Sequence, residues 1–199
     1  HFAIFNLCMK IISSEYELTV FLSDYSKKGS IGFAPTMGAL HQGHISLVKK
    51  SLNQNYLSIC SIFVNPTQFN NKSDLKNYPN SLEEDLKLLD KTSCDVVFTP
   101  SVKEIYPNGL PTKVYDFGVL DKVMEGAVRP GHFNGVAIAV SRFFEIVQPK
   151  RAYFGEKDFQ QLAIIRWLAA QKFKHIEIVP CSTLRENDGL AMSSRNLLL

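Results

Sequence analysis

Two histidines three positions apart lie in the segment with the most chemical potential. His41 and His44 follow Pro-Thr-Met-Gly (35–38) and have Gly43 between them. The residues before this segment are apolar, as in a buried strand, and apolar residues recur after it at helical spacing. We therefore expect a strand, a turn and a helix start whose first turn presents both histidines on one side. The free N–H groups of a helix start bind phosphate, and a glycine there leaves room for a ligand.

An isolated His-x-x-His pair has two other interpretations. The histidines could cap the helix or lie on the surface, or they could be two ligands of a metal. No third cluster of Cys, His or carboxylate follows at zinc-like spacing. Phosphate chemistry is therefore favoured over metal binding at this pair.

Polar side chains also follow other predicted strands, at 65–68, 155–158 and 193–195. Because the carboxyl ends of parallel strands lie at one edge of a sheet, these groups should meet in one cleft. They supply cations and hydrogen-bond donors, without a G-x-S-x-G elbow, a GxxxxGK[ST] loop or a GxGxxG motif. Such a set is typical of a site that stabilises a charged phosphate without a covalent nucleophile.

The elements that must position these residues alternate between strand and helix along the chain. This alternation predicts an α/β fold, a Rossmann-like open parallel sheet with helices on both faces and right-handed crossovers. The expected strands are 9–12, a strand from 31, 57–64, 94–99, an edge strand at 112–117, 151–154 and 176–181. The expected helices are 14–28, one to about 55, one capped by Ser81 with Glu84 in a capping box, 119–124, 133–148 and 159–171.

Composition excludes several classes of protein. The chain has 199 residues, 45% of them hydrophobic and 21% charged, which is ordinary for a globular protein. Its net charge of +3 is small and its Lys and Arg residues are scattered, so we expect no nucleic-acid partner. No apolar run is long enough for a membrane span, and residues 1–8 lack the features of a signal peptide. Four widely spaced cysteines without a C-x-x-C motif indicate reduced thiols and a cytoplasmic protein.

Five motifs, in order, resemble the pantoate–β-alanine ligase family. They are Pro-Thr-Met-Gly-Ala-Leu-His-Gln-Gly-His (35–44), Phe-Val-Asn-Pro-Thr-Gln-Phe (63–69), Arg-Pro-Gly-His-Phe-x-Gly-Val (129–136), Phe-Gly-Glu-Lys-Asp-Phe-Gln-Gln (154–161) and Met-Ser-Ser-Arg-Asn (192–196). The resemblance extends from about Met9 to Leu199. A lone His-x-Gly-His would indicate only the wider nucleotidyltransferase-like superfamily, which includes class I aminoacyl-tRNA synthetases.

The resemblance implies a reaction in two steps. ATP and pantoate form pantoyl adenylate and pyrophosphate, and the amine of β-alanine then gives pantothenate and AMP, with Mg²⁺ accompanying the nucleotide. It also implies a homodimer joined through this domain. By this resemblance, residues 9–199 are expected to be the nucleotide- and pantoate-binding domain, and the family's smaller C-terminal domain, which closes over the nucleotide, is expected to lie outside this sequence. Residues 1–8 are expected to be a natural extension or a cloning remnant.

The resemblance also assigns roles to individual residues. His41, His44, Lys157 and Arg195 are the expected catalytic residues: the histidines contact the ATP phosphates, the lysine the α-phosphate and the pantoate carboxylate, and the arginine the β- and γ-phosphates. The expected substrate-binding residues are Met37, Phe63, Asn65, Gln68, Gln161 and Arg129. The expected nucleotide-binding residues are Pro35, Thr36, Gly43, Gly155, Asp158, Met192, Ser193 and Ser194. Asp85 is the expected Mg²⁺ ligand.

Several of these residues have plainer interpretations. Met37 and Phe63 could be core residues, and Asp158 could be the cap of a helix. Asp85 could be a solvated helix charge. Gln161 could face solvent, although it lies one helical turn from the lysine of its motif and should share that face.

Two other functions remain open at this point. The protein could be a different nucleotidyltransferase that releases its nucleotidyl product, but Gln68 and Gln161 argue against that alternative. It could also be a binding or dimerisation module, a truncated substrate-binding half with little turnover. His132 is interpreted as a structural residue at a helix start.

Overall fold

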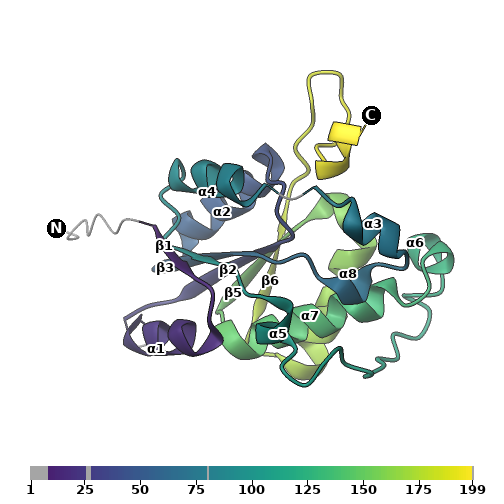
Figure 1. Ribbon diagram of the computed structural model, residues 1–199, viewed down its shortest axis with the longest axis horizontal. Coiled ribbons are helices and arrows are strands. Elements are labelled where there is room, and N and C mark those ends of the chain that lie inside the picture. Colours follow the sequence, from purple (N-terminus) through teal and green to yellow (C-terminus); the bar gives the residue numbers. More distant parts are fainter. Residues whose placement is uncertain (1–8, 26–27, 80, 199) are drawn as a thin grey trace.

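A computed structural model describes residues 9–25, 28–79 and 81–198 as an α/β fold built on one central sheet (Figure 1). All strand pairs are parallel, in the order β1-β4-β3-β2-β5-β6. The strands are β1 (Lys10–Ile12), β2 (Ile31–Thr36), β3 (Leu57–Ile62), β4 (Val96–Phe98), β5 (Arg151–Gly155) and β6 (Glu177–Cys181). The chain winds outward from β2 through β3 to β4, and in the other direction from β5 to β6. The strand order therefore reverses between β2 and β5, where open α/β sheets bind ligands.

Helices cover both faces of the sheet (Figure 1). The α-helices are α1 (Glu15–Tyr25), α2 (Gln42–Gln54), α3 (Lys72–Lys76), α4 (Leu82–Asp90), α5 (Val102–Ile105), α6 (Met124–Val128), α7 (His132–Val147) and α8 (Phe159–Lys172). Three short 3-10 helices are η1 (Pro66–Gln68), η2 (Glu156–Asp158) and η3 (Ser194–Leu198). Helices α2 and α4 cover one face, and α1, α7 and α8 cover the other.

The core is divided by the sheet into two apolar clusters. Phe33 and Phe154 point toward the side of α7 and α8, whereas their neighbours Ala34 and Tyr153 point toward the side of α2. This alternation follows from the two-residue period of a strand. Because both faces are covered, the central strands β2 and β3 are buried at nearly every position rather than at every second residue.

The predicted fold class is confirmed, and so are the strands that were expected in the sheet itself. The edge strand predicted at 112–117 is wrong, since these residues pair with no strand in the described part of the chain. Tyr115 and Phe117 instead pack on Trp167 of α8, with ring centroids 6.3 and 4.9 Å from the indole. Their alternation reflects this contact, which imitates the pattern of a strand.

Two further local predictions differ from the structure. The helix predicted at 119–124 is misplaced: residues 119–123 form turns and a bend, and the helix of this region is α6, which begins at Met124. Ser81 does cap α4, but its side chain makes no capping hydrogen bond, so the expected capping box is absent. The expected extension at 1–8 lies outside the described residues. No described helix is both long and apolar enough to cross a membrane.

Candidate active site

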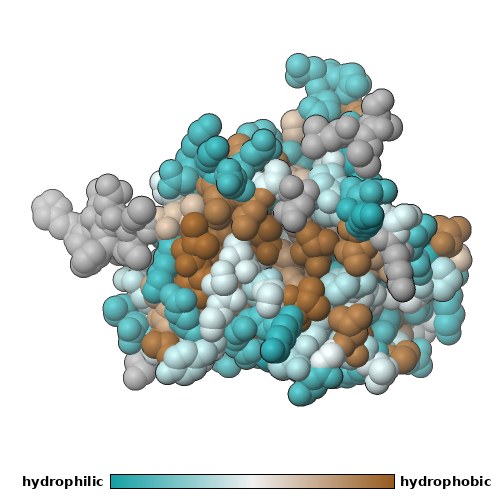
Figure 2. Space-filling view, viewed as in Figure 1, coloured by the Kyte–Doolittle hydropathy of each residue, from teal (hydrophilic) through white to brown (hydrophobic). Residues whose placement is uncertain are grey.

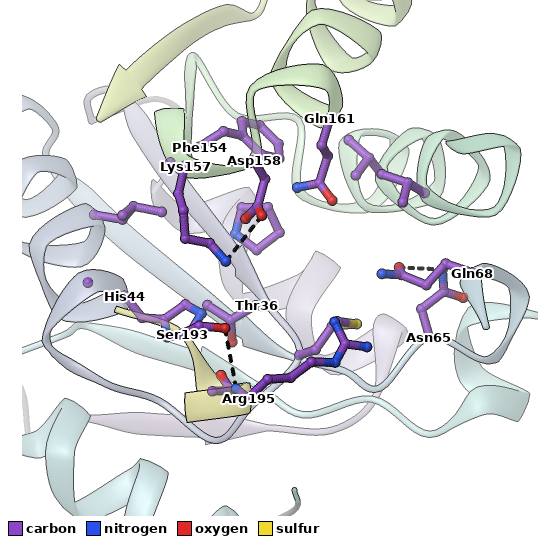
Figure 3. A pocket seen from close by; sticks show the side chains of 18 of the residues that line it. Thr36, His44, Asn65, Gln68, Phe154, Lys157, Asp158, Gln161, Ser193 and Arg195 are labelled. Carbon is purple, nitrogen blue, oxygen red and sulfur yellow. Dashed lines mark hydrogen bonds and ion pairs between the residues drawn. The ribbon is translucent and has the colours of Figure 1, made fainter. Parts of the chain in front are cut away.

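A pocket of about 240 Å³ opens beside the carboxyl ends of β2 and β5. It is lined by every residue expected in the site except Asp85. Three of its walls come from β2 and the start of α2, from β5 with η2 and α8, and from the segment around η3. Figure 3 shows the side chains of these walls directed toward a common space. Residues far apart in the sequence therefore meet at the point where the strand order reverses.

The two histidines form the start of α2 and also line the pocket. His41 is the N-cap of the helix, and its Nδ1 accepts a hydrogen bond from the Gly43 amide at 3.1 Å. Nδ1 of His44 accepts from the His41 amide at 3.3 Å, and the two ring centroids lie 4.1 Å apart. The histidines thus cap the helix, as one interpretation expected, and they also line the pocket. Since each Nδ1 is an acceptor, the neutral rings carry their protons on Nε2.

Both imidazoles are held neutral. Burial, with the nearby His41 and Lys157, lowers the pKa of His44 to about 3. Burial and Lys157 also lower the pKa of His41. At neutral pH the pair therefore offers uncharged hydrogen-bond donors, and the positive charge of this wall comes from Lys157 and the start of α2.

Gly43 is required for this arrangement. A Cβ atom at this position would lie 2.8 Å from Cε1 and 2.9 Å from Nδ1 of His41. The imidazole would have to leave its capping position to make room. Glycine thus serves the packing of the first histidine, in addition to leaving space beside the backbone.

Asp85 holds the turn before the histidines. Its carboxylate accepts hydrogen bonds from the amides of Ala39 at 2.9 Å and Leu40 at 2.6 Å. Ala39 needs this support because its φ of 49° lies in the left-handed region, next to Gly38 at 84°. Burial raises the pKa of Asp85, and the two amide hydrogen bonds oppose that rise.

The plainer interpretation of Asp85 as a solvated charge is wrong, since only 1% of this residue is exposed. It does not line the pocket either, and both of its oxygens are engaged by the turn. Among the described residues, no three His, Cys, Asp or Glu side chains cluster as metal ligands. The magnesium role of Asp85 stays a prediction, and the structure shows a structural role for this residue.

The side chain of Gln68 is oriented by Asn65. Asn65, 2% exposed, donates to Oε1 of Gln68 at 3.0 Å and to the carbonyl of Gly135 at 3.1 Å. Its Oδ1 accepts from Thr67 and from the hydroxyl of Tyr106 at 2.9 Å. Both polar atoms of the Asn65 side chain are thus hydrogen-bonded within the protein. Because Oε1 of Gln68 is an acceptor already, its Nε2 is left to donate to a ligand.

His132 also supports Gln68 and was not among the expected site residues. Its Nδ1 lies 2.8 Å from the carbonyl oxygen of Gln68, to which it donates, and its ring lines the pocket. Burial lowers the pKa of His132. The motif at 129–136 pointed to this loop. Ser182 and Thr183, which also line the pocket, directly follow β6 and could have been found by the strand-end rule.

Lys157 and Asp158 follow β5 on η2. The Lys157 ammonium lies 3.2 Å from Oδ1 of Asp158, and Figure 3 shows both side chains directed into the pocket with Gln161. Asp158 is the N-cap of α8 but makes no side-chain capping bond. The amide of Gln161 is half-buried and hydrogen-bonds to no described residue. These groups are therefore positioned for a ligand.

The segment around η3 contributes a second cation. Ser194 anchors it by donating to the carbonyl of Ala39 at 2.9 Å, and the Arg195 amide donates to Oγ of Ser193 at 3.3 Å. The Arg195 guanidinium pairs with Asp74 at 3.2 Å and is half exposed. Its backbone is thus fixed near the start of α2, while its side chain can turn toward an anion.

Other expected residues contact the pocket in simpler ways. Phe63 is both a core residue, 4% exposed, and part of the wall, and the half-buried Met37 lines the same pocket. Thr36 also lines the pocket, and its hydroxyl donates to the carbonyl of Ser61 at 2.6 Å. Arg129 forms an ion pair with Glu125 of α6 at the rim.

A parallel α/β sheet with a helix start, two neutral imidazoles and two cations at its switch point defines a nucleotidyltransferase-like, phosphate-handling enzyme. The comparisons with known proteins narrow this class. The family model for pantoate-beta-alanine ligase matches residues 10–199, so the chain belongs to the pantoate–β-alanine ligase family.

Similar proteins agree with this assignment. The pantothenate synthetase of Bacteroides fragilis is 54% identical, over 96% of this chain and 68% of the relative. That of Cytophaga hutchinsonii is 51% identical, over 94% of this chain and 66% of the relative.

Solved structures of the family share this fold. The pantothenate synthetase of Thermus thermophilus has a TM-score of 0.90 and 46% identity, with 96% of this chain and 68% of that chain covered. The pantoate-beta-alanine ligase of Francisella tularensis, a complex with "Beta-gamma ATP" and β-alanine, has a TM-score of 0.93 and 43% identity, over 96% and 73% of the two chains.

Proposed function

We propose that this chain carries the site of an AMP-forming ligase that joins pantoate to β-alanine at the expense of ATP. One observation supports this function above all. Neutral imidazole donors and the cations Lys157 and Arg195 share one pocket with two amide side chains, Gln68 and Gln161. The first group suits the phosphates of ATP, and the second suits the hydroxyls and carboxylate of pantoate.

In the first step a carboxylate oxygen of pantoate attacks the α-phosphorus of ATP. The bond from that phosphorus to the bridging oxygen breaks, and pyrophosphate leaves. Lys157 reduces the repulsion between the two anions as they meet. Nε2 of His41 and His44, with the start of α2, donates to the oxygens on which charge develops. No protein nucleophile takes part.

In the second step the neutral amine of β-alanine attacks the acyl carbon of pantoyl adenylate. The bond to the phosphate oxygen breaks, AMP leaves, and the nitrogen gives up one proton to solvent as the amide forms. Arg129, at the rim, is positioned for the carboxylate of β-alanine or for a phosphate.

The remaining residues of the pocket bind the two first-step substrates. Met37 and Phe63 would pack on the methyl groups of pantoate. Asp158 and the backbone of Gly155 would hold the ribose hydroxyls. The other expected nucleotide contacts are Pro35, Thr36, Gly43, Met192, Ser193 and Ser194.

A Mg²⁺ ion that accompanies ATP would not find a ready site in this chain. Magnesium is bound by carboxylates together with phosphates and waters. Among the described pocket residues, the carboxylates of Asp158 and Glu125 are paired with cations. These residues do not fit a preformed magnesium site.

The test is to supply the chain with ATP, pantoate and β-alanine and to measure pantothenate and pyrophosphate. Pyrophosphate release that requires pantoate supports the proposal. Release without pantoate would identify a different nucleotidyltransferase. Calorimetric binding of ATP and pantoate without turnover would identify a substrate-binding half. If the chain neither binds ATP and pantoate nor converts them, the proposal is contradicted altogether.

We also propose that the protein forms a homodimer in the cytoplasm. Membership of the family supports the dimer, and so does the exposure of Val114 and Val119, which are 81% and 72% exposed. Cys60, Cys94 and Cys181 are buried free thiols, which suits a reducing compartment. Sedimentation equilibrium at assay concentration tests the dimer, and a monomer would contradict it.

A further inference from the structure

Gln160 sits beside the pocket residue Gln161 but faces a different part of the chain. It is buried, with 6% exposed. Its Nε2 donates to the carbonyls of Leu120 at 2.6 Å and Val123 at 2.8 Å, and its Oε1 accepts from the Gly126 amide at 3.4 Å. Both donor hydrogens of this amide are thus committed to one segment of backbone.

That segment, 119–128, has one apolar anchor, Leu120, which packs against the core at its start. The loop and cap hydrogen bonds of its backbone run within the segment or to nearby positions such as Phe117. Val123, Met124 and Val128 are 49%, 65% and 78% exposed. Figure 2 shows apolar surface over α6 at the right edge of the molecule. Burial of its own side chains therefore does not set the position of α6.

The segment places an ion pair at the rim of the pocket. Glu125 and Arg129, one helical turn apart, both line the pocket and pair with each other. We infer that Gln160 is a positioning residue that fixes α6 to α8, and so sets the place of Arg129 relative to Gln161. The part of this inference that concerns ligands rests on the proposed function, because it requires a carboxylate substrate at Arg129.

Hydrogen exchange tests the tether without any ligand. The variant Gln160→Met keeps most of the volume but removes both donors and the acceptor. We expect faster exchange of the amides of 119–128 and unchanged exchange in the sheet. Gln171→Met, at an exposed position of the same helix, is the matched control and should change neither. Unchanged exchange at 119–128, or faster exchange over the whole chain, would overturn the inference.

A double-mutant cycle with Arg129→Ala tests the consequence for binding. Pantoate, β-alanine and ATP are titrated separately by calorimetry. Gln160→Met and Arg129→Ala should each weaken the binding of the same carboxylic acid, either pantoate or β-alanine, by about tenfold or more. Both variants disturb one charge-assisted contact. In the Arg129→Ala background the effect of Gln160→Met should disappear. Additive effects, or equal weakening of all three ligands, would contradict the inference.

Gly126→Ala provides a second variant if Gln160→Met folds poorly. Its Cβ would lie 2.3 Å from the carbonyl oxygen of Asp121, so it displaces the segment and leaves α8 intact. Gly126→Ala should weaken the binding of the same acid as Gln160→Met does. Weaker binding of a different ligand would overturn the inference. If the unmodified chain binds none of the three ligands, the proposed function fails, and hydrogen exchange alone decides whether the tether exists.

Discussion

At the scale of single residues, the buried imidazole of His44 makes stability depend on pH. Its pKa is about 3 in the folded chain, and an unfolded histidine titrates near 6.5. As the pH falls below 6.5, His44 takes up a proton in the unfolded state but stays neutral in the folded state. The stability present above pH 6.5 is therefore lost toward pH 3, by up to about 1.4 kcal/mol per pH unit. The lowered pKa of His41 acts in the same direction.

Urea unfolding at pH 7.5 and 5.5 measures this effect. In His44→Gln the free energy of unfolding should fall less between the two pH values than in the unmodified chain. His175→Gln, at an exposed position, is the control and should keep the full dependence. A His44→Gln variant with unchanged pH dependence would show that this imidazole is not held neutral by the fold.

Lys157 tests the chemistry of the pocket. The charge of its ammonium lowers the pKa of both histidines, and it would face both anions of the first step. Lys157→Ala should slow pantoate-dependent pyrophosphate release by about 10²–10³-fold, as expected for one preorganised charge-stabilising group. Single-turnover kinetics measures the step directly. Lys174→Ala, at an exposed position outside the pocket, should react normally.

At the scale of elements, the turn between β2 and α2 depends on Asp85 of α4. Asp85→Ala leaves the amides of Ala39 and Leu40 buried without an acceptor, which should cost roughly 2–4 kcal/mol in the free energy of unfolding. Glu84→Ala, at an exposed position of the same helix, should cost less than about 0.5 kcal/mol. Denaturant unfolding compares the two variants.

A further variant, Asp85→Asn, separates the structural role of Asp85 from a metal role. If Asp85 acts only through the turn, Asp85→Asn should leave the Mg²⁺ concentration for half-maximal pyrophosphate release unchanged. A large rise in that concentration, with stability equal to that of Glu84→Ala, would favour metal binding instead.

The elements also show where sequence patterns are informative. The central strands were predictable because a strand covered on both faces is mostly apolar, without strict alternation. The expectation that ligands bind at the carboxyl ends of parallel strands then placed the pocket. The strand expected at 112–117 was predicted wrongly, because alternation caused by packing on Trp167 has the same period as alternation in a sheet. The role of Asp85 was also hidden, since its partners are backbone amides, which no residue type reveals.

At the scale of the whole molecule, the pocket joins three distant parts of the chain. The Ser194 hydroxyl reaches the carbonyl of Ala39, 155 positions earlier, and η2 lies between them in the sequence. A nucleotide in this pocket would contact all three parts. Its binding energy should therefore stabilise the fold as a unit, by about 2.7 kcal/mol at a concentration 100 times the dissociation constant.

Thermal unfolding with and without ATP measures this coupling. The unmodified chain should unfold at a higher temperature with ATP, in one transition. In Arg195→Ala the increase should be smaller at the same ATP concentration, because a cation for the phosphates is lost while the Ser194 anchor stays. Arg166→Ala, exposed on α8 and outside the pocket, should keep the full increase. Equal increases in Arg195→Ala and Arg166→Ala would mean that Arg195 remains paired with Asp74 and does not contact the nucleotide.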